Sequence, residues 1–212
     1  MRYAALFVGF ALLGSNIGRA ATTITVTSTA QEATSVNPGG VGNGNCTLGE
    51  AILAANTNAT VDGCTGAAGP PFTIVLSPAT YSLGAAHNYW YGPNALPPIA
   101  TTITIEGNGA VLQATDPTRL RFFFIGGPLN GEFFTPGPGN LTLRNLTLTG
   151  GRQNGGGSPG GGGGAGMGGA LFNQGTLVLN SVTMNGNTAT GGSSDTGGAL
   201  PGGGGMGQMV GS

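Results

Sequence analysis

Charged residues are scarce in this sequence. Its 212 residues include six arginines, seven acidic residues and no lysine, so only 6% of the chain is charged. An average globular domain has about 25%. A nucleic-acid-binding surface needs many cations to displace counterions, and this chain cannot supply them. Without lysine, Schiff-base chemistry, a P-loop phosphate clamp and a lysine general base are excluded as well.

Histidine and cysteine are scarce as well. The chain has one histidine, His87, and two cysteines, Cys46 and Cys64. A zinc site takes four ligands at short spacing, and only His87 is available to join the cysteines, so we expect no metal site and no cofactor. The cysteines then form a disulfide or remain free thiols, and export of the chain favours the disulfide.

The first twenty residues have the pattern of a secretory signal peptide. Arg2 supplies the positive start, residues 4–13 are apolar or glycine, and small residues at Gly18 and Ala20 predict cleavage after Ala20. The apolar run is too short for a transmembrane helix, which takes about 20 residues. We therefore expect a protein that is secreted or held at the bacterial cell surface, with no membrane span.

Glycine and proline are abundant, at 45 and 13 residues, but 39% of the chain is hydrophobic, so a folded core is expected. Alternating apolar and polar residues predict strands at residues 22–27, 72–76, 101–105, 141–148 and 177–184. One helix is predicted. Thr47 and Glu50 form a capping box at its start, and Asn56 is a suitable residue to end it.

Two of these strands repeat each other. Residues 141–148 align with residues 177–184, and the apolar alternation breaks by one residue in both, at Arg144-Asn145 and Asn180-Ser181. The chain must turn a corner there if both halves keep the same inward face. Gly-Gly-Ala-Leu at 168–171 also recurs at 197–200. Repeated strands with variable insertions predict a parallel β-solenoid, in which each rung packs only against its neighbours.

The segment Asn45-Cys-Thr-Leu-Gly-Glu-Ala-Ile-Leu-Ala-Ala-Asn56 resembles the CSLREA motif, C-S-L-R-E-A-I-x-A-A-N, of secreted bacterial right-handed β-helix proteins. Thr47 replaces serine and keeps the capping hydroxyl, whereas Gly49 replaces arginine and loses a charge. Residues 74–83 and 103–109 resemble the opening rungs of pectate-lyase-like helices. Residues 168–187 are similar to repeats of bacterial surface and polymorphic outer-membrane proteins.

This resemblance implies an all-β, right-handed parallel β-helix with a short N-terminal capping helix. The expected organisation is a signal peptide at 1–20, a strand and capping region at 21–66, rungs at 67–200 and a Gly-rich tail at 201–212. The tracts 155–157, 160–169 and 202–207 would be mobile insertions at rung corners. The tail interrupts a new rung, so we expect a coil that is incomplete at its C-terminus and self-associates through the open rung.

Few residues are candidates for chemistry. The segment with His87, Tyr89, Trp90 and Tyr91 either stacks on a sugar ring or packs as a loop over the helix flank. Arg119 and Arg121 either bind an anionic sugar or form the polar side of a strand. The acidic residues are isolated in sequence, with Glu50 a cap and Asp62 a turn residue, and no catalytic residue is assigned.

Two functions remain. The first is a non-catalytic secreted or cell-surface scaffold, adhesin-like, whose partner is an extracellular glycan or a host or neighbouring surface. The second is the N-terminal part of a polysaccharide-degrading β-helix, a lyase or a glycosidase. The lack of lysine, the single histidine and the scattered acids favour the scaffold.

Overall fold

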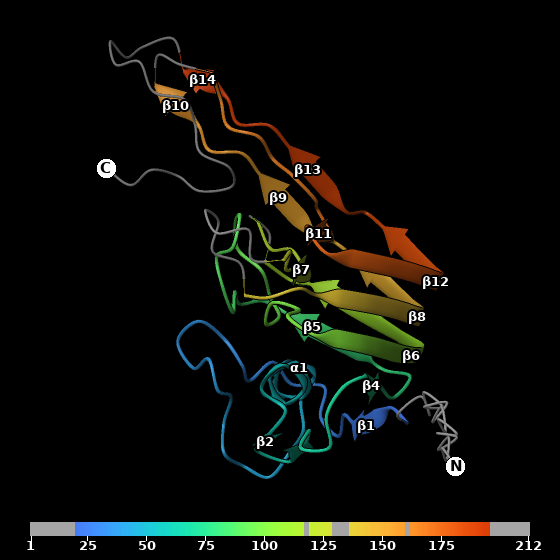
Figure 1. Ribbon diagram of the computed structural model, residues 1–212. Coiled ribbons are helices and arrows are strands. Elements are labelled where there is room, and N and C mark those ends of the chain that lie inside the picture. The colour runs from blue at the N-terminus through green and yellow to red at the C-terminus, as the bar shows by residue number, and fades with distance from the viewer. Residues whose placement is uncertain (1–19, 117–118, 129–135, 160–161, 196–212) are drawn as a thin grey trace, which may run out of the picture.

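A computed structural model of the chain describes residues 20–116, 119–128, 136–159 and 162–195. The predicted signal peptide, apart from Ala20, and the predicted tail lie outside the described residues. The described chain is mostly β-structure with one short helix, α1 (Leu48–Thr57) (Figure 1). The strands are β1 (Thr22–Thr25), β2 (Thr60–Val61), β3 (Cys64–Thr65), β4 (Phe72–Val75), β5 (Thr80–Leu83), β6 (Thr102–Ala114), β7 (Phe123–Ile125), β8 (Asn140–Thr149), β9 (Arg152–Asn154), β10 (Ser158–Pro159), β11 (Leu171–Asn173), β12 (Thr176–Asn185), β13 (Thr188–Thr190) and β14 (Ser194–Asp195).

The largest sheet has the strand order β1-β4-β6-β8-β12, with β5 also paired to β6, and all of its pairings are parallel. Its register aligns inward side chains into columns. One column contains Ile24, Ile74, Ile105, Leu143 and Leu179. The first four are at most 1% exposed. Ile74, Ile105 and Leu143 have a paired strand on either side, whereas Ile24 lies on the terminal strand β1. These stacked columns form most of the hydrophobic core.

Two consecutive sets of four strands, β7–β10 and β11–β14, repeat each other. The consecutive strands β7, β8, β9 and β10 pair in parallel with β11, β12, β13 and β14, respectively. Figure 1 shows the second set lying along the first. Among the described residues these pairings make one large sheet and several two-stranded sheets, without a closed coil. The structure therefore establishes a mostly parallel β-architecture.

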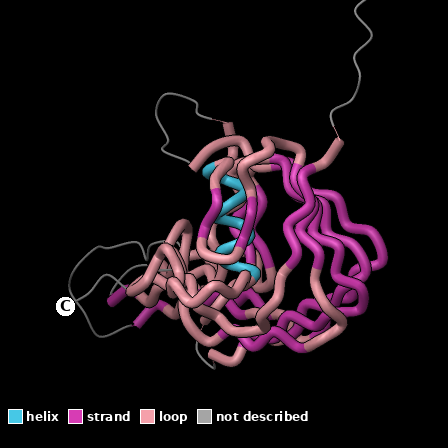
Figure 2. The backbone as a smooth tube through the Cα atoms, turned by 90° about the horizontal axis from the view of Figure 1, so that it is seen from below, coloured by secondary structure: helices cyan, strands magenta, loops and turns pink. Residues whose placement is uncertain are grey.

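The predicted corner in the repeated strands is a single left-handed residue. Asn145 in β8 has φ 51° and the equivalent Ser181 in β12 has φ 54°. Neither residue has a partner in the β8–β12 register, so the alternation restarts after it and Leu146 is buried like Leu143. Figure 2 shows the strands of the large sheet bending together. The corner was predicted correctly, although β8 and β12 each continue through it as one strand.

Helix α1 begins as the sequence predicts and ends later. The Thr47 hydroxyl accepts a hydrogen bond from the Glu50 N–H, and the Glu50 carboxylate accepts one from the Thr47 N–H. The predicted stop at Asn56 is wrong: the helix continues to Thr57 and Asn58 takes the left-handed conformation. The Asn56 side chain instead bonds backbone groups of the loop before β6.

A disulfide joins Cys46, just before the helix cap, to Cys64 in β3. Both cysteines are 1% exposed and belong to the core, next to α1. This confirms the predicted pairing. The bond ties the entry to the helix to the hairpin of β2 and β3 that follows it.

The described glycine tracts form an ordered ladder, which we call the glycine arm (residues 155–157, 162–166 and 190–192). Gly164 donates a hydrogen bond to the Gly156 carbonyl, Gly192 donates one to the Gly164 carbonyl, and each bond is 2.8 Å long. The three segments approach closely because they have almost no side chains. The sequence predicts mobile insertions here, and in the structure these segments are hydrogen-bonded to one another. The tract 202–207 lies outside the described residues.

The inward columns lose their cover at β12, the last strand of the large sheet. Leu179 is 45% and Met184 is 44% exposed, whereas their register partners Leu143 and Leu148 in β8 are fully buried. The core is thus open along this edge. Among the described residues the only helix is α1, which has ten residues. It is too short to cross a membrane.

Candidate functional site

The predicted carbohydrate contacts lie on the loop between β5 and β6, which Asn94 holds in a compact turn. Asn94 is fully buried, and its side-chain amide donates to the carbonyl oxygens of Trp90, at 2.9 Å, and Gly92, at 2.8 Å. Its backbone N–H donates to the Asn88 carbonyl at 2.8 Å. These hydrogen bonds hold the loop in its compact turn.

Two of its aromatic side chains pack onto phenylalanines from the two short strands β7 and β11. Trp90 stacks on Phe124 with ring centroids 5.9 Å apart and planes 7° from parallel. Tyr91 contacts both Phe124 and Phe172, at centroid distances of 5.8 and 5.1 Å. Trp90 and Tyr91 therefore pack against β7 and β11, whereas the packed-loop alternative placed this segment over the helix flank.

The same loop leaves a shallow open pocket of about 350 Å³ that Tyr89, Trp90 and Tyr91 line. Tyr89 is 58% exposed. None of these lining residues is acidic, and the lining is mostly apolar. Aromatic rings in an open pocket suit a sugar ring, because the C–H groups on one face of the sugar can pack against the aromatic face.

His87 belongs to the loop but serves a different purpose. Its Nε2 lies 3.2 Å from the Pro38 carbonyl oxygen, and the Asn88 side-chain amide lies 3.4 Å from its Nδ1. Because a carbonyl only accepts, Nε2 carries the proton. Burial lowers the pKa of His87, and the bond to Pro38 opposes that effect. The structure thus places His87 as a neutral tether between this loop and the segment before α1.

The prediction that Arg121 forms the polar side of a strand is also wrong. Arg121 is fully buried and does not lie on the polar side of a strand. Its Nη2 donates to the Tyr91 carbonyl at 2.8 Å, and its guanidinium lies 5.2 Å from the Phe172 ring centroid. Burial lowers the pKa of Arg121 to about 10. The unbroken apolar run at residues 122–125 was the available signal, because it indicates a strand buried on both faces.

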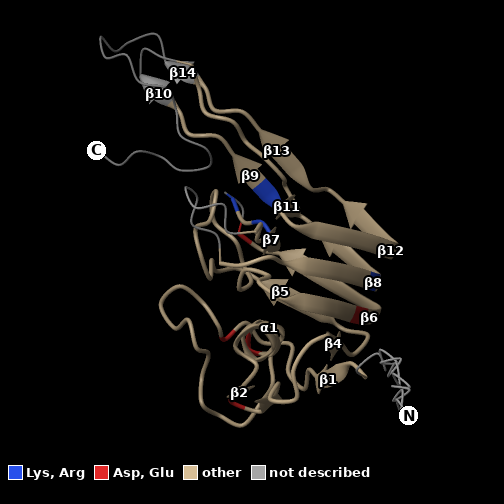
Figure 3. Ribbon diagram, in the orientation of Figure 1, with Lys and Arg blue, Asp and Glu red and all other residues tan. Residues whose placement is uncertain are grey.

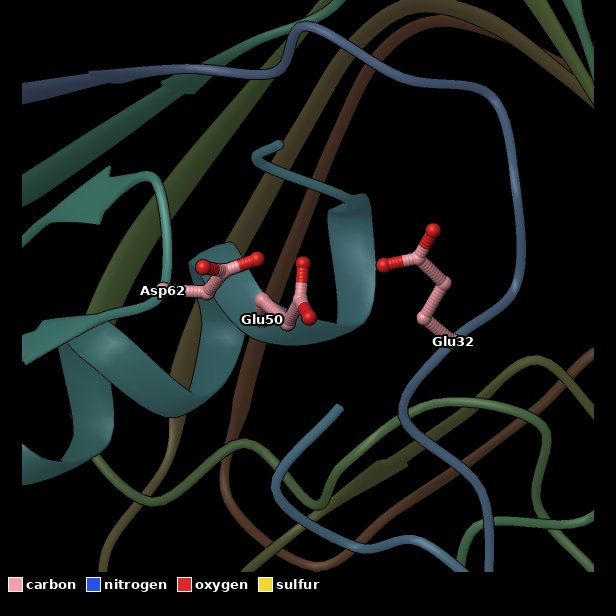
Figure 4. Close-up of side chains that lie close together, drawn as sticks. All are labelled: Glu32, Glu50 and Asp62. Carbon is pink, nitrogen blue, oxygen red and sulfur yellow. The ribbon is translucent and has the colours of Figure 1, made fainter. Parts of the chain in front are cut away.

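A second polar cluster surrounds the helix cap, where the side chains of Glu32, Glu50 and Asp62 come together (Figure 4). One carboxylate oxygen from each lies within 4.8 Å of the others. They come from the segment before α1, the first turn of α1 and the turn after β2. No local spacing in the sequence links Glu32 to the other two, so these acids look isolated from the sequence alone.

These carboxylates are the described residues most suited to hold a cation, but most of their oxygens already accept hydrogen bonds. Glu50 accepts from the backbone N–H groups of Val41 and Thr47, at 3.2 and 3.0 Å. Asp62 accepts from Asn43 and Gly44. The cluster therefore fastens the segment 41–47 against the helix start, which is a structural task.

Other charges are spread over the molecule (Figure 3). Glu106 on β6 accepts a hydrogen bond of 2.7 Å from the Asn145 side chain on the outward face of the large sheet. No two described carboxylates flank the aromatic pocket, since the described residues that line it are Tyr89, Trp90 and Tyr91. Comparison of the chain with protein-family models, with curated proteins and with solved structures gives no match.

Proposed function

We propose that this chain is a secreted or cell-surface scaffold, adhesin-like and non-catalytic, built on a right-handed parallel β-helix. The strand-for-strand pairing of β7–β10 with β11–β14 supports the coil, because a rung that repeats must return each strand to the same sheet. The columns of inward residues support it too, since rungs bury their apolar side chains only against neighbouring rungs.

One observation carries the non-catalytic part of the proposal: the prominent polar side chains are engaged in holding loops. His87 is tied to Pro38, Glu50 and Asp62 accept from backbone N–H groups, and Arg121 donates to the Tyr91 carbonyl. General acid–base chemistry needs a group whose proton is available to a substrate. These groups instead stabilise the loops that the coil presents.

The proposed contact with a partner is the aromatic pocket, with Tyr89 as its most exposed ring and Trp90 and Tyr91 beneath. The partner of matching chemistry is an extracellular glycan. His87 lies on the same loop, where it positions these rings through its bond to Pro38. The pocket is also what favours the second candidate function, the N-terminal part of a polysaccharide-degrading β-helix.

A glycan panel tests both functions. The full chain is incubated with pectins and other polysaccharides, with and without calcium, and both binding and cleavage are measured. We expect binding without new reducing ends or unsaturated uronates. Appearance of either product would favour the enzyme and overturn the scaffold.

A pair of variants locates the contact. Tyr89→Ala should weaken glycan binding about 10-fold, because it removes an exposed stacking ring without opening the core. Val178→Ala is the control, since Val178 is 48% exposed and lies on β12 of the large sheet instead of on the aromatic loop. Equal binding by both variants would remove the pocket from the proposal.

Export is the remaining part of the proposal. A buried disulfide is consistent with an oxidising compartment. N-terminal sequencing of the protein recovered from the culture medium or the cell surface tests export directly. A chain beginning at Ala21 is expected, and retention of the first twenty residues in the cytoplasm would contradict export.

A further inference from the structure

The edge of the large sheet at β12 is an exposed, uncharged surface. β12 is the last of the described strands in the sheet order, and its inward side chains Leu179 and Met184 are nearly half exposed. Neither β12 nor β13 contains a charged residue or a proline (Figure 3). Charges and prolines are the devices that normally keep an edge strand from pairing with another strand. Nothing in the sequence of this edge opposes pairing.

The inward row of β12 is symmetric about its corner. Leu177 and Leu179 precede the corner at Asn180-Ser181, and Val182 and Met184 follow it at matching distances. Reversing the direction of the strand therefore puts an apolar side chain back at each inward position. Such a row can pair with a copy of itself in the opposite direction, as a two-fold interface requires.

We infer that β12 pairs antiparallel with β12 of a second copy of this chain, about a two-fold axis that passes through the corner. In this register Leu179 lies opposite Val182 of the partner subunit, and Leu177 lies opposite Met184 of the partner subunit. Opposite residues in an antiparallel pair point to the same face, so all these side chains face inward. The inference rests on the proposed coil, in which the two open rungs close each other.

A second copy fits this edge for two physical reasons. The two strands have the same ten-residue length and the same set of unpaired backbone groups. The N–H and C=O groups of one strand can therefore form hydrogen bonds with those of the other. Both edges are uncharged, so no like charges meet across the axis. A further rung of the same chain would instead pair in parallel and would leave each molecule monomeric.

The oligomeric state of the full chain tests the inference. Sedimentation equilibrium should show a discrete dimer. Leu179→Asp should raise the dimer dissociation constant about 100-fold or more, because it buries two unpaired carboxylates in each dimer. Val178→Asp is the matched control: Val178 is adjacent and 48% exposed, but it points to the outward face, so this dimer should persist. Circular dichroism of both variants verifies that they fold.

Cross-linking tests the register. Oxidation of a mixture of Leu179→Cys and Val182→Cys chains should join the two different chains, whereas Leu179→Cys alone should not cross-link. A monomer, an open-ended polymer or a dimer joined through Leu179→Cys alone would overturn the inference. These outcomes leave the glycan scaffold untouched, and glycan cleavage would overturn the scaffold without affecting the dimer, so the two failures are distinguishable.

Discussion

At the scale of single residues, His87 is a titratable group whose hydrogen bonds hold a loop in place. Its Nε2–H donates to the Pro38 carbonyl, and its Nδ1 is left as an acceptor facing the Asn88 amide. A second proton on Nδ1 would remove that acceptor and would place a charge in a partly buried site. The loop with the aromatic pocket is therefore held best by the neutral ring.

This arrangement predicts loss of stability in mild acid. The pKa of His87 is below 6.5 in the folded chain, so the unfolded chain takes up more protons as the pH falls through this value. The free energy of unfolding should therefore decrease between about pH 7 and about pH 5. His87→Gln keeps an N–H donor but does not titrate, so it should flatten this decrease. Urea unfolding of both proteins at the two pH values measures the effect, and parallel decreases would contradict it.

Helix α1 shows, at the scale of elements, how a weak helix is stabilised by its surroundings. It has ten residues and would be marginal alone. Its start is fixed by the capping box and by the disulfide between Cys46 and Cys64, and its apolar face packs into the core. The disulfide and the cap act on the same end of the helix.

Loss of the disulfide should therefore destabilise the whole N-terminal region. Cys64→Ser should lower the free energy of unfolding by about 2–5 kcal/mol, because the unfolded chain gains the freedom that the closed loop removes. The double variant Cys46→Ala, Cys64→Ala controls for a lone reactive thiol and should lose a similar amount. Titration of free thiols in the folded, oxidised protein gives the complementary measurement, and any free thiol would contradict the bond.

The glycine arm is an element whose packing depends on the absence of side chains. A Cβ on Gly163 would overlap the carbonyl oxygen of Gly192, whereas a Cβ on Gly162 would meet nothing within 4 Å. The two neighbouring glycines therefore offer a matched pair of substitutions at the same point of the chain.

Gly163→Ala should separate the segments of the arm, and Gly162→Ala should not. Hydrogen exchange should show loss of protection at the amides of Gly164 and Gly192, with the large sheet unchanged, because these two amides bond across the arm. Equal exchange in both variants would mean that the segments do not approach as closely as the structure shows.

The molecule as a whole is a stack in which burial depends on the neighbouring strand. The same inward column contains Leu143, covered by β12, and Leu179, which nothing described covers from above. Both side chains are leucines in the same register, so the two positions differ mainly in whether a second neighbouring strand packs against them.

Truncation of the two leucines should therefore have unequal effects. Leu143→Ala should cost about 2–5 kcal/mol of unfolding free energy, because it leaves a cavity in the core. Leu179→Ala should cost less than about 1 kcal/mol at concentrations low enough to keep the chain monomeric, because that side chain is already half in water. Denaturation of dilute protein measures both, and equal costs would show that Leu179 is covered after all.

The sequence by itself determined the local features of this protein. Period-2 alternation located β1, β4, β8, β12 and the first part of β6, whereas β5 was not predicted. The capping box located the start of α1, and the interrupted alternation at Asn145 located the corner. These features depend on residues that are close together in the chain, so local pattern was sufficient. The pairing of Cys46 with Cys64 was also accessible, because no other cysteine competes.

Only the tertiary structure decided which distant groups meet. The stacking of Trp90 on Phe124, the burial of Arg121 beside Tyr91 and the cluster of Glu32 with Glu50 and Asp62 join residues that no spacing relates. The hydrogen-bonded arrangement of the glycine arm could not be predicted for a related reason. A glycine-rich sequence indicates a flexible backbone, and the contacts that order it come from other segments of the chain. Each of these contacts joins segments that are distant in the sequence, so only the folding of the whole chain determines which groups meet.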